Sequence, residues 1–178
     1  EPYWVNVGLG GRLIARAGSA AQQKRILPEL IQGKHRLAFA HTERAARYDL
    51  GHVGARAKRS GGGYTLEGEK RAVLHGASAD TLIVSARTSG AATDPTGVSL
   101  FLVPKDARGL EVKLLPTMDQ TRKLCEVTLK DVSVGADALV GEKGKGWQPL
   151  ARVVDRAAVA LCAEMCGGAQ KILEMTTE

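Results

Sequence analysis

The first 33 residues carry apolar side chains at the spacing of an α-helix. This spacing predicts one helix that ends at Gly18 and a second that ends at Gly33, because glycine readily follows the last turn of a helix. Ser19 followed by Gln22 forms a capping-box pattern, which marks the start of the second helix. Pro28 lacks a backbone N–H and lies inside that helix, so we predict a kink or a short break there.

Between residue 37 and about residue 140, short apolar runs separated by turn signals replace the helical spacing. The runs at 81–87 and 98–103 are almost continuously apolar, as expected for strands that are buried on both faces. Other segments alternate between polar and apolar positions, and the glycines at 61–63 join two of them into a hairpin. These short strands predict an antiparallel sandwich or barrel.

Helical spacing returns after Gly146 and predicts a helix of roughly 30 residues at the end of the sequence. Cys162 and Cys166 lie one turn apart on its apolar side. Two cysteines without two further ligands nearby do not make a metal site, so we predict that both are buried in a core. We expect the same of Cys125, which opens a predicted strand, and we predict no metal site.

Composition narrows the class of protein. Hydrophobic residues make up 44% of the 178 residues, which is enough to form a core and argues against disorder. No run approaches the roughly 20 apolar residues that cross a bilayer, and the first residues lack the pattern of a secretory leader. Three cysteines are too few for a disulfide scaffold, which favours a reduced, cytoplasmic setting.

The formal charge of +6 leaves polyanionic small ligands open. Nucleic acid is the least favoured partner, because the cations are scattered and aromatic side chains for stacking are few. The segment 38–50, AFAHTERAARYDL, concentrates polar side chains where the helical part meets the strands, a common place for a ligand cleft. A solvated charged loop is the simpler interpretation of these residue types alone. The glycine-rich 141–146 lacks the Lys-Ser/Thr ending of a phosphate loop and predicts a turn.

Four segments closely resemble the acyl-CoA dehydrogenase family in their order and spacing, most of all the small subunit of heteromeric members such as pimeloyl-CoA dehydrogenase. They are residues 18–50, 63–88, 97–112 and 127–147. The resemblance implies an α+β fold in which a middle β-barrel or β-sandwich domain, residues 37–142, is flanked by partial helical domains, residues 1–36 and 143–178.

The resemblance also implies an activity. Members of this family bind FAD between the β domain and the C-terminal helices, and they oxidise an acyl-CoA to the 2,3-enoyl-CoA with hydride transfer to the flavin. Their electrons pass to an electron-transfer flavoprotein. We therefore expect FAD as cofactor, an acyl-CoA as substrate, and a homo-oligomer or a hetero-oligomer with a larger dehydrogenase subunit. The catalytic glutamate of the family belongs to later helices outside this sequence, so no catalytic residue is predicted.

The segment 39–49 is similar to the first flavin motif of the family. By this resemblance, Thr42 hydrogen-bonds the isoalloxazine ring, and Phe39 and His41 make backbone or packing contacts to it. Tyr48 stands where the family has a serine that touches both the flavin pyrophosphate and the substrate. These four residues are therefore candidates for the cofactor site, and Tyr48 is also a candidate for the substrate site.

The segment 68–76 is similar to the second flavin motif. Ala72 stands in place of a tryptophan that packs on the flavin, and Leu74 in place of a threonine near flavin N5. Asp155 matches the aspartate of an Asp-x-x-Arg pattern that helps to hold CoA, but Ala158 replaces its arginine. These departures motivate an alternative, a non-catalytic or site-completing small subunit of a heteromeric enzyme. A third hypothesis, prompted by the net positive charge, is that a dehydrogenase-like fold binds nucleic acid.

Overall fold

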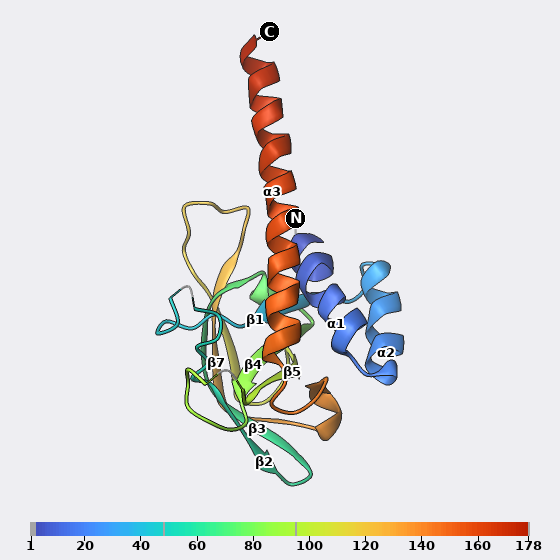
Figure 1. The fold of residues 1–178 in the computed structure, drawn as a ribbon, viewed down its shortest axis with the longest axis vertical. Helices are drawn as coiled ribbons and strands as arrows, with labels where there is room; N and C mark the ends of the chain where they lie inside the picture. Colours follow the sequence, from blue (N-terminus) through green and yellow to red (C-terminus); the bar gives the residue numbers. More distant parts are fainter. Residues whose placement is uncertain (1–2, 48, 95, 178) are drawn as a thin grey trace.

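The computed structural model describes residues 3–47, 49–94 and 96–177. A helical part at the start of the chain leads into a large sheet, and one long helix follows the sheet (Figure 1). The helical part consists of a π-helix η1 (Trp4–Gly11), which continues directly into α1 (Arg12–Ala17), and of α2 (Ala20–Ile31). The extended backbone at Gly18 ends α1 where the sequence predicted an end, whereas the π-helical geometry of η1 had no sequence signal.

The predicted caps of α2 are confirmed. The Ser19 hydroxyl accepts a hydrogen bond from the backbone N–H of Gln22, and the Gln22 side chain accepts one from the backbone N–H of Ser19. At the other end Gly33 has a φ of 71°, and its N–H reaches the Leu30 carbonyl at 3.0 Å. The predicted break at Pro28 is wrong, because α2 runs through it. Pro28 lies on the exposed side of the helix, where water can satisfy the carbonyl left without a donor.

Eight strands form one sheet in the order β6-β7-β3-β2-β4-β5-β8, with β1 paired to β4. The strands are β1 (Leu37–Ala40), β2 (Arg56–Ser60), β3 (Gly63–Leu74), β4 (Thr81–Arg87), β5 (Val98–Pro104), β6 (Leu110–Leu114), β7 (Leu124–Val134) and β8 (Leu139–Val140). Two 3-10 turns, η2 (Gly76–Ser78) and η3 (Ala136–Ala138), lie between strands. The edge strands β6 and β8 do not pair with each other in the described residues.

The expectation of purely antiparallel strands needs a correction. β1 pairs with β4 in parallel over four residues, and β2 meets the same edge of β4 in parallel at Arg56 and Arg87. In the sequence the β2–β3 hairpin lies between β1 and β4. The chain returns after the hairpin, so that β4 runs in the same direction as β1. The hairpin itself is confirmed: Ser60 pairs with Gly63 across a two-residue turn in which Gly61 and Gly62 both have positive φ.

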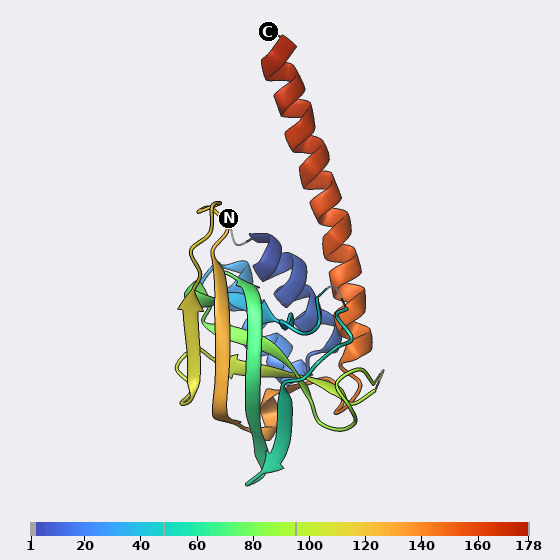
Figure 2. The same ribbon diagram turned by 90° about the vertical axis from the view of Figure 1, so that its left-hand side faces the viewer.

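β4 lies between two hydrophobic cores. Leu82 and Val84 face a core formed with β2, β3 and β7, whereas Ile83 between them faces a second core formed with the helices. β1 and β5 alternate in the same way, and burial on both faces was predicted for β4 and β5 from their nearly continuous apolar runs. In Figure 2 the helices accordingly lie on one side of the strands. This two-sided burial fixes the position of the segment that leaves β1, which carries the predicted flavin motif.

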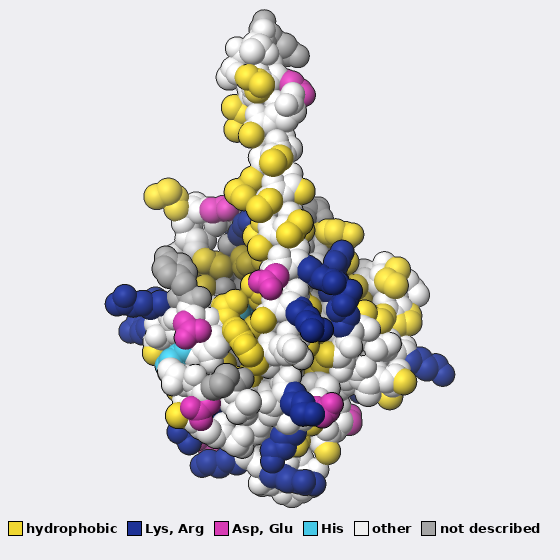
Figure 3. All heavy atoms as spheres, in the orientation of Figure 1, with side chains coloured by type: hydrophobic (Ala, Val, Ile, Leu, Met, Phe, Trp, Pro, Cys, Tyr) yellow, Lys and Arg dark blue, Asp and Glu magenta, His cyan; other side chains and the backbone are white. Residues whose placement is uncertain are grey.

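The long helix α3 (Trp147–Thr177) has 31 residues, as its spacing predicted. Leu150, Val153 and Ala157 are buried against the body, but the helix then extends away from it (Figures 1 and 2). Hydrophobic side chains continue along this free half (Figure 3). Cys162 and Cys166 lie there and are exposed, so the prediction that they are buried is wrong for the described residues. No helix among those residues is both long and apolar enough to cross a membrane.

Candidate functional site

The segment that leaves β1 lies against β3. The backbone N–H of Arg71 donates a hydrogen bond to the carbonyl of Thr42 at 2.8 Å. This bond brings Thr42 of the first predicted motif beside Ala72 of the second. Two of the predicted cofactor residues, 30 positions apart in the sequence, therefore meet at one place in the fold.

A buried ion pair between Lys70 and Glu43 holds the segment after β1 in place. Lys70 Nζ lies 2.6 Å from Glu43 Oε1 and 2.9 Å from Ser85 Oγ, and the Lys70 side chain is inaccessible to solvent. The Glu43 carboxylate also accepts hydrogen bonds from the backbone N–H groups of Gly54 and Ala55, at 2.7 and 3.0 Å. Through these contacts the Lys70–Glu43 pair holds the segment after β1 against β3 and β4, and against the residues that lead into β2.

Electrostatics keeps this pair ionised. Burial lowers the pKa of Lys70 to about 8, and the Glu43 carboxylate opposes that shift. Burial alone would raise the pKa of Glu43, but the Lys70 ammonium and the two backbone N–H groups together bring it below its usual value. Near neutral pH both Lys70 and Glu43 are therefore charged. Their polar atoms are hydrogen-bonded within the protein and are not available to a ligand.

One ring nitrogen of His41 lacks a hydrogen-bond partner, although the His41 carbonyl accepts from Lys70 and Ser85. Its Nδ1 is buried and makes no hydrogen bond within the described residues. Burial, and then the charge of Lys70, lower the pKa of His41 to about 4, so the imidazole is neutral near neutral pH. Its ring lies 4.8 Å from the ring of Phe39, centroid to centroid, and Phe39 is itself buried in the core that faces the helices. A buried nitrogen without a partner marks a position where a ligand can supply the missing hydrogen bond.

The neighbouring part of β3 is irregular. The pairing of β3 with β7 shifts between Lys70 and Val73, and Ala72 has a φ of 53°. Positive φ is uncommon for a residue with a Cβ, and such backbone often occurs at functional sites. Ala72 is exposed at this bulge, directly after Arg71, which donates to the Thr42 carbonyl.

Leu74 lines a cavity of about 400 Å³ between the sheet and the helices. Trp4 of η1, His75 and Glu164 of α3 line the same cavity. Arg122 donates a hydrogen bond to the Glu164 carboxylate, which closes one side. The cavity thus joins the predicted cofactor residue Leu74 to both helical parts of the chain.

The remaining predicted site residues do not join this group. Asp155 is exposed on α3, and no hydrogen bond or ion pair connects it to the others in the ranges that the structure describes. Tyr48, predicted to contact both flavin and substrate, lies outside the described residues. No group of three or more His, Cys, Asp or Glu side chains among the described residues is arranged to hold a metal ion.

Arg87 is a structural residue of the site that sequence reasoning missed. Its guanidinium is buried and donates to the carbonyls of Val53, Ala92 and Thr96 at 3.0, 2.8 and 2.7 Å. Further bonds reach Gly51 and Asp94. One side chain therefore holds the loop that follows the first flavin motif against the loop between β4 and β5. Glu43 and Lys70 were missed in the same way, because nothing in their local sequence indicates that they are buried together.

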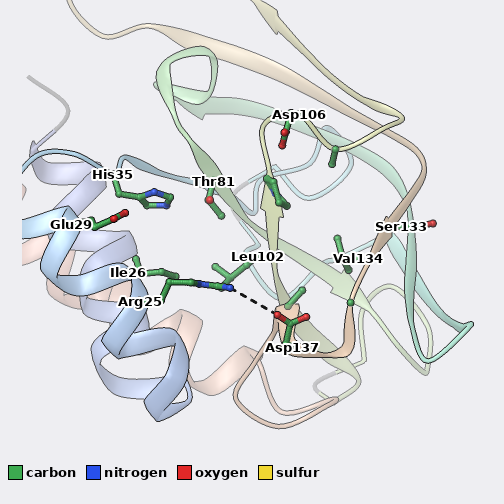
Figure 4. A pocket seen from close by; sticks show the side chains of 14 residues that line it. Arg25, Ile26, Glu29, His35, Thr81, Leu102, Asp106, Ser133, Val134 and Asp137 are labelled. Atoms are coloured by element: carbon green, nitrogen blue, oxygen red, sulfur yellow. Dashed lines mark ion pairs between the residues drawn. The ribbon is translucent and has the colours of Figure 1, made fainter.

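A larger cavity lies elsewhere. It measures about 520 Å³ between α2 and the ends of β5 and β7 (Figure 4). Arg25 and Asp137 face each other across it at 3.9 Å, and His35 on its wall has a buried Nε2 without a partner in the described residues. None of the predicted flavin or substrate residues lines it, so its size alone does not make it the site of the predicted chemistry.

Comparison with known proteins decides the family. The model of the acyl-CoA dehydrogenase middle domain matches residues 38–132, which are more than half of the chain. The chain belongs to the acyl-CoA dehydrogenase family. The matched region contains the segment after β1, the bulge in β3 and Arg87. His41, Thr42, Ala72 and Leu74 thus all lie within the residues that match the middle-domain model.

Individual acyl-CoA dehydrogenases are similar over a larger part of the chain. Mitochondrial isovaleryl-CoA dehydrogenase of Oryza sativa subsp. japonica is 31% identical over 97% of the chain and 42% of its own length. The structure of butyryl-CoA dehydrogenase from Megasphaera elsdenii superposes with a TM-score of 0.80 at 28% identity, over 86% of the chain and 41% of its own. A glutaryl-CoA dehydrogenase from Mycobacterium smegmatis, solved in complex with FADH2, gives 0.75 at 26% identity, over 84% and 38%. The chain spans about two fifths of the length of these relatives.

Proposed function

We propose that this chain supplies the flavin-facing β part of an FAD-dependent acyl-CoA dehydrogenase. The observation that carries the proposal is the meeting of the two motifs: the Arg71–Thr42 hydrogen bond brings Thr42 beside Ala72, and Leu74, two residues further along β3, lines the 400 Å³ cavity. The buried Nδ1 of His41 leaves a hydrogen-bonding position open there. A flat heteroaromatic ring with several polar edge atoms fits such a patch.

In this proposal Thr42 offers its hydroxyl and His41 its backbone to the isoalloxazine ring. Ala72 and Leu74 would complete the contacts to that ring. Phe39 supports His41 from the core. When bound, FAD would accept a hydride from the acyl β-carbon while the α-proton leaves to a base, so that a carbon–carbon double bond forms.

The contribution of this chain would be orientation. The Lys70–Glu43 pair fixes the backbone that carries Thr42, and Arg87 fixes the loop at Gly51 and Val53 that follows. The walls of the 400 Å³ cavity would exclude water around the acyl group. No residue of this chain is assigned as the base. Glu164 lines the cavity, but its carboxylate is occupied by Arg122.

The partners belong to the same proposal. An acyl-CoA would be the substrate, an electron-transfer flavoprotein would accept the electrons, and further copies or a larger dehydrogenase subunit would complete the oligomer. The division into residues 1–36, 37–142 and 143–178 and a cytoplasmic location remain predictions.

The test is the visible absorption spectrum of the full-length protein, alone and with a candidate partner subunit. We expect a flavin band that an acyl-CoA bleaches in the absence of oxygen. Thr42→Val should lower FAD retention. Thr65→Val removes the same hydroxyl from a half-buried threonine at the far end of β3 and should leave FAD retention unchanged. Failure to bind FAD both alone and with the partner would contradict the proposal.

A specific observation favours a second candidate, a site-completing small subunit. Ala72 presents no large ring to a flavin, and Ala158 provides no cation for CoA. In that case the flavin band would appear only in the complex, and FAD would remain with the partner when the two chains are separated. Turnover by this chain alone would contradict the second candidate and leave the first.

A further inference from the structure

The cavity of about 520 Å³ beside α2 has its own lining (Figure 4). Ile26 and Leu102, which are buried, and the partly buried Val134 give it an apolar floor. None of the described residues that line it also lines the 400 Å³ cavity at Leu74. A ligand held beside α2 would therefore not occupy the space proposed for the acyl group.

Three carboxylates surround this apolar floor. Glu29 comes from α2, Asp106 follows the end of β5, and Asp137 belongs to η3. Arg25 is the Lys or Arg side chain of the described lining, so acidic groups outnumber these basic groups three to one. The chain as a whole has the opposite balance, with 25 Lys and Arg against 19 Asp and Glu. The cavity is therefore an acidic place on a basic protein.

The carboxylates of this cavity are available to a ligand. Neither Glu29 nor Asp106 forms an ion pair within the described residues. Asp137 meets Arg25 at 3.9 Å, but both side chains are largely exposed, and an exposed pair of this kind adds little stability. A ligand cation can thus replace Arg25 at Asp137 at a small cost.

The cations closest in sequence to the acidic lining are engaged elsewhere. Arg36 follows His35, and Lys105 precedes Asp106. Both bind the carboxylate of Asp80, at 3.2 and 3.1 Å, and Asp80 does not line the cavity. These two positive side chains are therefore held on Asp80, which leaves the acidic lining without them.

His35 adds a polar atom that lacks a partner. Its ring points into the cavity (Figure 4), and its Nε2 is buried without a hydrogen-bond partner in the part of the chain that the structure describes. An imidazole nitrogen that carries no proton accepts a hydrogen bond from an ammonium group. A buried polar atom of this kind on a cavity wall favours a ligand that supplies the missing hydrogen bond.

We propose that this cavity binds a small organic diamine, in which a short apolar chain joins two ammonium groups. The ammonium groups would bind the carboxylates of Glu29 and Asp106 by charge-assisted hydrogen bonds, and His35 would accept a further one. The methylene groups between them would cover the apolar floor, which favours their removal from water. A metal ion would make no use of that floor, and no three His, Cys, Asp or Glu side chains among the described residues are arranged to hold one. The proposal is independent of the dehydrogenase activity, since it uses none of the residues assigned to FAD or to the acyl group.

The test is calorimetric titration of the full-length protein with cadaverine, in a cacodylate buffer that contains no amine. We expect saturable binding of one cadaverine per chain. Pentylamine, which has a similar apolar chain but one ammonium group, should bind at least about tenfold more weakly. Magnesium ions at the concentration of cadaverine should not displace it. Equal binding of pentylamine and cadaverine would overturn the diamine as ligand, and displacement by magnesium would reduce the site to a general attraction for cations.

Charge-neutral variants locate the site. Glu29→Gln and Asp106→Asn should each weaken cadaverine binding by about tenfold or more, because each removes a charge-assisted contact. Glu67→Gln and Asp131→Asn make the same changes at exposed positions of β3 and β7 outside the cavity, and they should change binding less than about threefold. Equal losses in all four variants would overturn the proposal.

Arg25 provides a test of opposite sign. Arg25→Gln removes the positive charge that opposes the ligand, so cadaverine should bind more tightly, by about threefold or more. Lys24→Gln removes the same charge from an exposed residue next to it that does not line the cavity, and it should have a smaller effect. Weaker binding in Arg25→Gln, or equal effects of the two variants, would contradict the proposal. All these variants should retain FAD, which separates this result from a failure of the proposed function.

Discussion

Lys70 Nζ and Glu43 Oε1 lie 2.6 Å apart, and 0% of the lysine side chain and 10% of the glutamate side chain are exposed. The pair connects the segment after β1 to β3, and through Ser85 it also reaches β4. It therefore sets the backbone from which Thr42 projects. The same pair has a cost, because both charges have been removed from water.

Replacing one member of this pair should be strongly destabilising. Lys70→Met leaves the Glu43 carboxylate without its charged partner, so we expect the free energy of unfolding in urea to fall by about 3–5 kcal/mol. The double variant Lys70→Met/Glu43→Leu should lose less than Lys70→Met alone, because it removes the unpaired charge. Lys145→Met breaks an exposed pair with Glu142 and should change stability by less than about 1 kcal/mol. A loss below about 1 kcal/mol for Lys70→Met would show that the pair does not hold the segment.

Stability should depend on pH through His41. The pKa of His41 is lowered from 6.5 to about 4, so below pH 6.5 the unfolded chain takes up a proton that the folded chain does not. The free energy of unfolding therefore falls as pH drops from 6.5 towards 4, by up to about 1.4 kcal/mol per pH unit from this group. Urea unfolding at about pH 7 and about pH 5 measures this slope. His41→Gln should reduce it, and an unchanged slope in that variant would assign the pH dependence to other groups.

Arg87→Lys should loosen two loops together. Lysine keeps the charge but has one ammonium group, which cannot reach five carbonyls arranged around a planar guanidinium. We expect a loss of roughly 2–3 kcal/mol and faster amide hydrogen exchange at both 49–53 and 91–97. The exposed Arg59 on the β2–β3 hairpin provides the matched control, and Arg59→Lys should leave both segments protected. Faster exchange in only one of the two loops would refute their common anchoring.

Two glycine-to-alanine changes should act in opposite directions. Gly68 has a φ of 140°, and a Cβ there would lie 2.7 Å from the Cα of Ala55, so Gly68→Ala should destabilise the protein by more than about 2 kcal/mol. Gly167 lies in the free half of α3, with nothing within 4 Å of an added Cβ. Gly167→Ala should therefore stabilise that helix by up to about 1 kcal/mol. Thermal unfolding followed by circular dichroism measures both changes, and an equal sign for the two would contradict this reading of the backbone.

The parts of the fold that could be predicted are those decided by neighbours in sequence. The Ser19–Gln22 cap spans three residues, the turn at Gly61 and Gly62 spans two, and α3 repeats one spacing over its whole length. The partners of β4 could not be predicted, because nothing local to β1 distinguishes a parallel neighbour from an antiparallel one. The exposure of Cys162 was missed for a related reason: an apolar stripe predicts that a face can be buried, not that the body reaches far enough to bury it.

The candidate site also has a part that the sequence predicts and a part that it does not. The family motifs pointed to Thr42 and Ala72, and the structure brings them together. The interaction that holds them joins Lys70 to Glu43, which are 27 residues apart, and each is an ordinary polar residue in its local pattern. An alanine side chain also gives no indication that the backbone at Ala72 has a positive φ. Long-range pairing and backbone strain arise from the assembled fold, so a single sequence does not reveal them.

The shared position of β4 has a consequence for cooperativity. Val84 belongs to the core between the strands and Ile83 to the core beneath the helices. If either core opens, one face of β4 is therefore exposed to water. The helical segments before β1 and the first turns of α3 should therefore melt in the same transition as the sheet. A piece cut at residues 37 and 142 would leave Phe39 and Ile83 facing water, and it should lose the steep unfolding curve of the intact chain.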